Sequence, residues 1–147
     1  MTEIILRNAV ESDSRLIIRL IHDAGINPTG LDWHRFIVAE DSNQQFLGCG
    51  QLKPHGKTVM EMASIAVIPS ARGQGIARLI IEYFEKTAPR PLFLTCRSQL
   101  GTFYSKFGFR VASETEMPAY FKRITRFSRI AKALHLIHVN ILVMILN

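Results

Sequence analysis

Hydrophobic residues recur along this chain of 147 residues with two different periods, which separate strands from helices. Residues 3–7 are rich in β-branched side chains and predict a strand. After the polar segment Glu11-Ser12-Asp13, apolar residues recur three and four positions apart, and this spacing predicts a helix. Gly25 predicts the end of that helix, because glycine readily adopts the left-handed conformation found there. The chain therefore opens with a strand and a helix.

Three strand patterns separated by turn residues follow. Residues 36–39, 46–52 and 59–68 are apolar or alternate between apolar and polar side chains. The polar residues 41–43 separate the first two patterns and predict a β-hairpin. Pro54-His55-Gly56 predict a second turn, before the third strand.

The period changes to that of a helix after Pro69. Five apolar residues share one helical face, and Pro89 ends the pattern. These five residues are Ile76, Leu79, Ile80, Tyr83 and Phe84. Beyond this helix, residues 92–96 predict a strand buried on both faces, 100–106 a short helix and 109–112 a further strand. This order predicts a mixed α/β (α+β) fold rather than the regular alternation of a doubly wound sheet.

The composition is that of a folded protein of one domain. Hydrophobic residues make up 48% of the chain and charged residues 20%, which excludes an intrinsically disordered protein. Cys49 and Cys96 lie in apolar strand patterns without the spacing of a metal site, so we expect both to be buried and reduced and expect no metal. Residues 1–7 lack the pattern of a signal peptide, and we expect a cytoplasmic location.

The positive charge is concentrated in one segment. The net charge is +6, but residues 122–147 carry five basic residues and no acidic one, while residues 1–121 are close to neutral. We therefore expect one domain at 1–121 with no nucleic-acid partner, followed by a basic and then apolar extension at 122–147. The apolar residues 133–146 have three alternative roles. They could complete the core as a strand or helix, pair with a second subunit in a homodimer or, less favoured, lie on an anionic membrane surface.

A glycine-rich junction between a strand and a helix is the most informative motif. Its sequence is Arg72-Gly73-Gln74-Gly75-Ile76-Ala77. Glycines let the backbone approach a ligand closely, and the free N–H groups at a helix start can bind a phosphate with help from Arg72. The junction lacks the Gly-Lys-Ser/Thr end of a P-loop and the third glycine of a dinucleotide site. A tight turn without a ligand is the alternative.

Two motifs resemble those of the GNAT superfamily of N-acetyltransferases. Ile65-Ala66-Val67 and Pro69, followed by Arg72-x-x-Gly75-x-Ala77, resemble its acyl-CoA signature, and residues 103–109 resemble its tyrosine-bearing helix and Gly-Phe turn. The resemblance covers residues 3–121 and implies a mostly antiparallel sheet, splayed at the acyl-CoA site and flanked by helices, with acetyl-CoA as co-substrate. The contacts it implies are Ile65, Ala66, Val67, Arg72, Gly73, Gln74, Gly75, Ile76, Ala77, Phe103 and Tyr104.

A narrower likeness concerns the acetyl acceptor. Residues 61–67 and 94–98 are similar to the matching segments of the acetyltransferase domain of N-acetylglutamate synthases, which implies an amino acid as the class of acceptor. Arg97 could then pair with its carboxylate, although a solvated loop arginine is the alternative. The expected acceptor contacts are Arg97, Ser98, Trp33 and Arg35. The resemblance also assigns residues 25–33 to the acceptor side of the site.

Acetyl transfer from a thioester needs a base for the amine and an acid for the leaving sulfur. Glu61 is the leading base, because strand alternation puts it on an apolar face, although a bulge would invert this facing and a surface glutamate is the alternative. The resemblance implies Tyr104 as the acid and the N–H of Val67 for the oxyanion; a core tyrosine is the alternative for Tyr104. His34 and His55 are reserve bases, expected on turns.

These observations predict an acetyl-CoA-dependent N-acetyltransferase that acts on a primary amine, such as an amino acid, by direct attack in a ternary complex. Two alternatives keep the fold: a non-catalytic acyl-CoA sensor and a protein N-acetyltransferase. A further alternative is a module that binds nucleic acid or membrane through residues 122–147.

Overall fold

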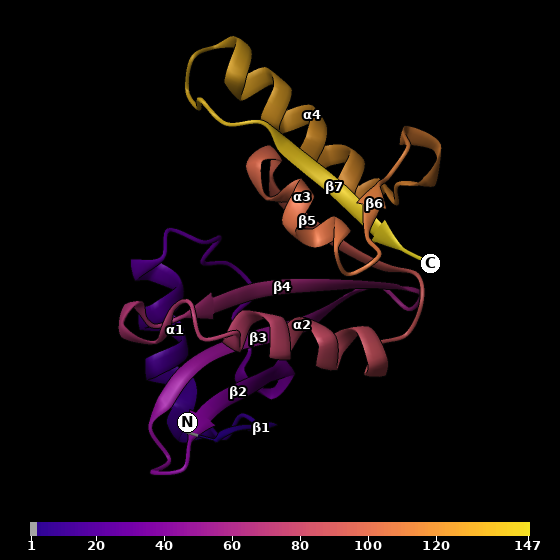
Figure 1. Cartoon of the computed structure of the whole chain (residues 1–147). Helices are drawn as coiled ribbons and strands as arrows, with labels where there is room; N and C mark the ends of the chain where they lie inside the picture. Colours follow the sequence, from indigo (N-terminus) through magenta and orange to yellow (C-terminus); the bar gives the residue numbers. More distant parts are fainter. Residues whose placement is uncertain (1–2) are drawn as a thin grey trace. The chain divides into compact units, whose positions relative to one another are not determined.

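The computed structural model describes residues 3–147, which form two compact units. Unit 1 comprises the described residues up to Lys53 together with Met62–Ala88, and unit 2 comprises Pro54–Glu61 together with Pro89–Asn147. Strand β4 (Val59–Val67; labelled in Figure 1) contributes to both units, because its residues up to Glu61 belong to unit 2 and those from Met62 belong to unit 1.

Four strands form the sheet of unit 1. They are β1 (Ile4–Asn8), β2 (Phe36–Asp41), β3 (Phe46–His55) and β4. β1 is antiparallel to β2 and β2 to β3, with an irregularity between Ala39 and Glu40, and β3 lies next to β4. The hairpin expected between β2 and β3 is confirmed: the carboxylate of Asp41 accepts hydrogen bonds from the N–H groups of Asn43 and Gln45.

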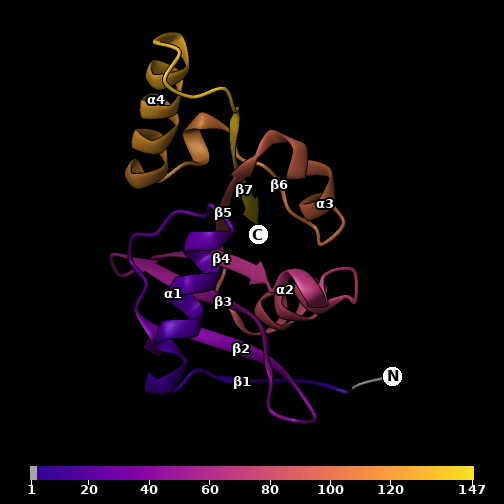
Figure 2. The same cartoon turned by 90° about the vertical axis from the view of Figure 1, so that its left-hand side faces the viewer.

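Helices α1 (Ser14–Asp23) and α2 (Ile76–Thr87) cover opposite faces of this sheet (Figure 2). The apolar side of α1 lies in one core cluster with Cys49 of β3. On the other face, a Cβ atom added to Gly50 would come within 2.8 Å of Ile80 and 3.1 Å of Phe84, so this glycine lets α2 pack closely. Neighbouring residues of a strand point to opposite faces, which accounts for this division. Gly25 ends α1 with a φ of +67°, as the sequence predicts.

Unit 2 holds the remaining strands and an aromatic core. β5 (Leu92–Arg97) is parallel to the start of β4 and antiparallel to β7 (Ile141–Leu146), which also pairs with β6 (Arg110–Val111). Its α-helices are α3 (Gly101–Ser105) and α4 (Ala119–Ala133). One buried cluster joins Phe93, Ala112, Phe121, Val143 and Ile145. Short 3₁₀ helices in the two units span Glu11–Asp13, Trp33–Arg35, Pro69–Ala71, Ser98–Leu100 and Glu114–Glu116.

The mixed α/β fold with a mostly antiparallel sheet is confirmed. The strands are hydrogen-bonded in the order β1-β2-β3-β4-β5-β7-β6, with β4 and β5 parallel. Residues 141–146 form a strand whose central residues are buried, whereas Leu134 and Leu136, earlier in the apolar segment, are exposed. The role of residues 133–146 as a whole stays a prediction. The domain boundary after residue 121 stays a prediction, and α4 runs across it. Within residues 3–147, no helix combines the length and the apolar character needed to span a membrane.

One turn is placed wrongly by the sequence pattern. His55 is the last residue of β3, and the turn to β4 begins at Gly56. Gly56 has a φ of +70°, a conformation that glycine tolerates best and that is not found in an extended strand. The chain therefore leaves the strand at Gly56, and His55 still belongs to it. His55 is consequently a half-buried strand residue and not a turn residue.

Candidate active site

The glycine-rich junction exposes a row of backbone groups in unit 1. β4 ends at Val67, a 3₁₀ helix follows, and α2 begins at Ile76. Gly73 and Gly75 both have a φ of +80°, a conformation that costs other residues about 1–2 kcal/mol. Gly75 is the N-cap residue and no side chain caps the helix, so the first N–H groups of α2 are available to a phosphate. This geometry suits the pyrophosphate of a coenzyme.

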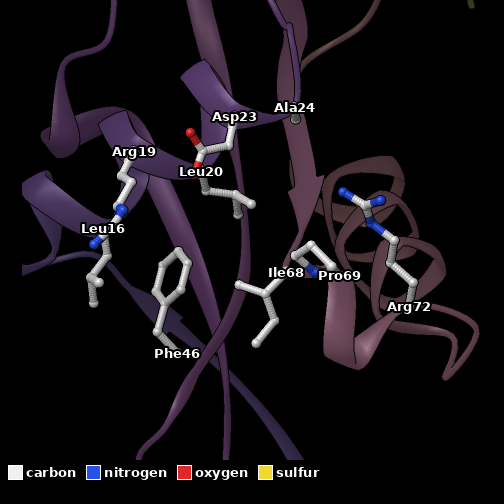
Figure 3. Close-up of a pocket in the computed structure, with 9 residues that line it drawn as sticks. All are labelled: Leu16, Arg19, Leu20, Asp23, Ala24, Phe46, Ile68, Pro69 and Arg72. Carbon is white, nitrogen blue, oxygen red and sulfur yellow. The ribbon is translucent and has the colours of Figure 1, made fainter.

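Arg72 connects the junction to the end of β4 and to a neighbouring pocket. Its Nε donates a hydrogen bond to the carbonyl of Val67 at 3.2 Å. The pocket has a volume of about 230 Å³. It is lined by Leu16, Arg19, Leu20, Asp23, Ala24, Phe46, Ile68, Pro69 and Arg72. Figure 3 shows Leu20, Phe46 and Ile68 converging, with Arg72 beyond Pro69. Among the expected acetyl-CoA contacts, Arg72 lines this pocket.

Strand β4 is distorted at Ser64. This residue has a φ of +57°, which is unusual for a residue with a side chain and marks local strain. Its carbonyl accepts a weak hydrogen bond from the Cys49 thiol, with the sulfur 3.7 Å away, and its hydroxyl accepts one from Gln51. The simple alternation expected along β4 therefore does not continue through Ser64. Ala66 beyond it is buried, whereas Ile65 and Val67 are half-buried.

Glu61 is held inside unit 2 by His55. The Glu61 side chain is only 6% exposed, so the alternative of a surface glutamate is wrong. Nε2 of His55 lies 2.7 Å from Oε1 of Glu61, within the distance at which a ring N–H donates to a carboxylate. The His55 ring stacks on Tyr120 at 3.7 Å between centroids. Burial, followed by the negative charge of Glu61, raises the pKa of the Tyr120 hydroxyl.

Tyr104 and Phe103 belong to an aromatic group on α3. Their ring centroids are 5.1 Å apart in an edge-to-face arrangement, and Phe107 and Phe109 lie close to them. Burial, followed by the negative charge that Cys96 would carry as a thiolate, raises the pKa of Tyr104 to about 12. Tyr104 is therefore protonated at neutral pH, as a proton donor must be.

The expected acceptor contacts of unit 2 lie where β5 ends. Arg97 is the last residue of β5, and its side chain is exposed. The N–H of Ser98 donates to the carbonyl of Asn140 at 2.8 Å, which fixes this connection against the segment before β7. An exposed guanidinium on a fixed backbone can meet a carboxylate, and solvation remains its alternative.

The expected acceptor contacts of unit 1 lie in the 3₁₀ helix before β2. Trp33 stacks on His34 at 3.7 Å between ring centroids and packs against the core cluster of unit 1. Nε of Arg35 lies 3.9 Å from the Asp32 carboxylate. His34 lies in this 3₁₀ helix and not on the expected turn; its ring is 2.7 Å from Asp32 and lowers the pKa of that carboxyl. The charged and polar groups of Asp32, His34 and Arg35 form a small cluster of their own.

The sequence pattern missed two polar residues on β3 and one on α4, and it placed a third β3 residue, the reserve base His55, on a turn. Gln51 is fully buried, Lys53 is 8% exposed, and His55 is the partner of Glu61. Tyr120 completes the stack on His55. The three on β3 recur every second residue in an otherwise apolar strand, and this alternation was the available signal. Among residues 3–147, no group of three or more His, Cys, Asp or Glu side chains could hold a metal ion.

A family comparison agrees with the geometry of the glycine-rich junction. The model of the acetyltransferase (GNAT) domain matches residues 32–111, more than half of the chain. No curated protein matches the sequence.

Solved structures share the fold. N-acetylglutamate synthase from Neisseria gonorrhoeae, complexed with coenzyme A and N-acetyl-glutamate, gives a TM-score of 0.75 at 22% identity, covering 100% of this chain and 36% of the synthase chain. This chain thus spans about a third of that synthase. Rv2747 from Mycobacterium tuberculosis, in complex with CoA and NLQ, gives 0.72 at 24% identity, covering 97% and 98%. A GNAT-family acetyltransferase from Staphylococcus aureus Mu50 gives 0.62 at 17% identity, covering 80% and 89%.

Proposed function

The chain belongs to the GNAT acetyltransferase family, and on this premise we propose that it transfers an acetyl group from acetyl-CoA to a primary amine, with amino acids as the leading class of acceptor. The structural neighbours that bind coenzyme A support an acyl-CoA co-substrate, and the neighbour complexed with N-acetyl-glutamate supports the acceptor class. The observation that carries the proposal is a buried glutamate hydrogen-bonded to a histidine in a chain that also presents the glycine-rich junction.

The backbone of the glycine-rich junction binds the pyrophosphate of acetyl-CoA in this proposal. The uncapped N–H groups at the start of α2 and the positive end of its dipole favour an anion there. The thioester supplies an acyl group bonded to a good leaving sulfur. The expected contacts along β4 and α3 remain part of the proposal: Ile65, Ala66, Val67, Phe103 and Tyr104.

Glu61 removes a proton from the ammonium group of the acceptor, directly or through a water molecule. The N–H of His55 holds the carboxylate in one orientation, which leaves its second oxygen to accept the proton. Tyr104 gives its proton to the leaving sulfur, since it is protonated at neutral pH. The backbone N–H of Val67 stabilises the negative charge on the carbonyl oxygen. The carboxylate of an amino acid would meet Arg97.

Calorimetry and a thiol-release assay test the proposal. We expect acetyl-CoA to bind with a micromolar Kd and free thiol to form with at least one small amine in a panel of amino acids, polyamines and peptides. Absence of acetyl-CoA binding at millimolar concentration would overturn it. Binding without thiol release across the panel would favour a non-catalytic sensor. Release with peptides alone would favour a protein N-acetyltransferase. A cytoplasmic location and a homodimer stay predictions from the sequence.

A further inference from the structure

Lys53 is a buried cation within unit 1. The residue is 8% exposed, and its Nζ donates a hydrogen bond to the carbonyl of Thr29 at 3.2 Å. None of the ion pairs formed by the described residues includes Lys53, and a carbonyl is a neutral acceptor that leaves two ammonium protons for other partners. Buried charges in proteins are usually paired, because an unpaired one is costly. The surroundings of Lys53 therefore favour a negatively charged ligand.

Gln51 gives this region a second polar group. It lies two residues before Lys53 on β3, so both side chains are on the same face of the strand. Its Nε2 donates to the carbonyl of Gly30 at 3.3 Å and to the hydroxyl of Ser64 at 2.9 Å. Because a carbonyl only accepts, this contact fixes which end of the amide is the nitrogen. Oε1 of Gln51 is then a buried acceptor without a partner among the described residues.

The loop opposite Lys53 is shaped to fit the ammonium group. Gly30 has a φ of +67°, and a Cβ atom there would lie 3.0 Å from both Cε and Nζ of Lys53. The Asn27 side chain accepts hydrogen bonds from the N–H of Thr29 at 3.0 Å and from its hydroxyl at 2.8 Å, which fixes the turn. Two consecutive carbonyls of this turn thus receive Lys53 and Gln51. A neutral donor would suffice to fasten the loop, so the positive charge itself needs another explanation.

We propose that Lys53, and not Arg97 alone, binds a carboxylate of the acetyl acceptor, so that the enzyme acts on carboxylate-bearing amines. This inference rests on the proposed function and adds a residue that the sequence pattern missed. A phosphate of acetyl-CoA is the other source of a suitable anion. The carboxylate is favoured, because the glycine-rich junction already provides backbone N–H groups and Arg72 for phosphate. The residues that form the Lys53 site all belong to unit 1.

Lys53→Met tests the proposal, since methionine keeps most of the apolar length of the side chain and removes the charge. The matched control is Lys57→Met, at an exposed lysine on the turn after β3. For the preferred amino acid, we expect Lys53→Met to raise KM about 10- to 100-fold, the range for losing a hydrogen bond to a charged group. The comparison compound is the amine that remains when the carboxylate is removed from that amino acid. For this amine, KM should change less than about twofold. Calorimetry should give an unchanged Kd for acetyl-CoA. Lys53→Arg should recover part of the loss.

Three results would overturn the inference. Equal losses with both amines would show that Lys53 only fastens the loop. A weaker Kd for acetyl-CoA in Lys53→Met, but not for 3′-dephospho-CoA, would assign the ammonium to a phosphate. A wild-type enzyme that does not distinguish the two amines would have no carboxylate site. Should acetyl-CoA fail to bind at all, the proposed function fails separately. Thermal unfolding with N-acetylated amino acids then decides the inference: we expect them to raise the Tm of the wild type but not of Lys53→Met.

Discussion

The two units prepare polar groups for chemistry in different ways. In unit 1 the groups suited to a ligand are backbone N–H groups beside Gly73 and Gly75 and a buried ammonium on Lys53. In unit 2 they are side chains held among aromatic rings, with Glu61 bonded to His55 and Tyr104 packed on Phe103. The first arrangement suits the binding of anions, and the second suits the movement of protons. Binding and proton transfer should therefore respond to different substitutions.

Removing the carboxylate of unit 2 should have the largest effect. Glu61→Gln keeps the size of the side chain and an oxygen for His55, but it removes the group that accepts the proton. We expect kcat to fall about 100- to 10,000-fold, the usual contribution of a general base, with the Kd for acetyl-CoA unchanged. Thiol release and calorimetry measure the two quantities. Glu114→Gln, at an exposed glutamate, is the control; an unchanged kcat in Glu61→Gln would remove this residue from the mechanism.

Charged groups offer the same comparison for stability. In unit 1, Arg7 bonds Asp13 and Glu40, both at 2.8 Å, and the two carboxylate side chains are only 8% and 12% exposed. Arg7→Met should lower the free energy of unfolding by about 2–3 kcal/mol, less than for a fully buried pair because Arg7 is partly exposed. In unit 2, Arg110 pairs with Glu116 at the surface, and Arg110→Met should have little effect.

Urea unfolding at several pH values measures this difference. Arg7 lowers the pKa of Asp13 below its ordinary 3.8, so the stabilisation is present above that pH and is lost as the pH falls. The difference in the free energy of unfolding between the wild type and Arg7→Met should therefore become smaller as the pH is lowered. Equal effects of Arg7→Met and Arg110→Met at pH 7 would contradict the contrast between buried and exposed charges.

Tyr104→Phe separates proton donation from packing in unit 2. We expect kcat to fall about tenfold, at the low end for an acid catalyst because a phenol with a pKa of about 12 is a weak acid. The folded chain holds this proton more tightly than the unfolded chain, whose tyrosine has a pKa near 10. The contribution of Tyr104 to stability is therefore present in full below pH 10 and is reduced by about 2 kcal/mol once the pH reaches 12.

Thermal unfolding between pH 8 and roughly 12 follows that loss across the tyrosine range. Tyr104→Phe should not show the part that Tyr104 causes, whereas Tyr83→Phe, at an exposed tyrosine, should behave like the wild type. The same kcat in both variants would leave Tyr104 with a packing role alone.

Two glycines provide the smallest and most closely matched test. Gly75 in unit 1 and Gly56 in unit 2 have φ values of +80° and +70°, and an added Cβ would meet no atom within 4 Å at either position. Alanine should therefore strain both backbones by about 1–2 kcal/mol. We expect Gly75→Ala also to weaken acetyl-CoA binding about tenfold, while Gly56→Ala lowers stability alone. Calorimetry and urea unfolding on both variants distinguish the cases; weaker binding in both would contradict a phosphate site confined to the junction.

Sequence patterns predicted the elements and the junction because both depend on local spacing. Apolar residues at helical spacing predicted α2. The turn before it was predictable as well, because Gly73 and Gly75 are the residue type that adopts a positive φ most readily. Strand alternation was a poorer guide to the direction of the Glu61 side chain. Ser64 takes a left-handed backbone conformation, which its residue type does not predict.

Contacts between segments far apart in the sequence escaped prediction. The pairing of His55 with Glu61 depends on where β3 ends, and the sequence pattern placed the turn after β3 two residues too early. The burial of Lys53 could not be predicted from the residues around it, because it depends on a loop more than twenty residues earlier in the chain. A contact between two distant side chains leaves no pattern in the sequence of either segment, whereas a glycine at a turn can be recognised from its own residue type.

The position of β7 has a consequence for how the chain is made. β7 lies between β5 and β6, although β6 is synthesised first, and β6 is a strand of two residues that pairs with β7. The strands and helices of unit 1 all precede β5 in the chain. They therefore emerge from the ribosome first, and unit 1 can fold early. The edge of β5 opposite β4 stays open to other chains until Ile141–Leu146 emerge. A ribosome paused between α4 and β7 would thus expose an unpaired edge of an apolar strand.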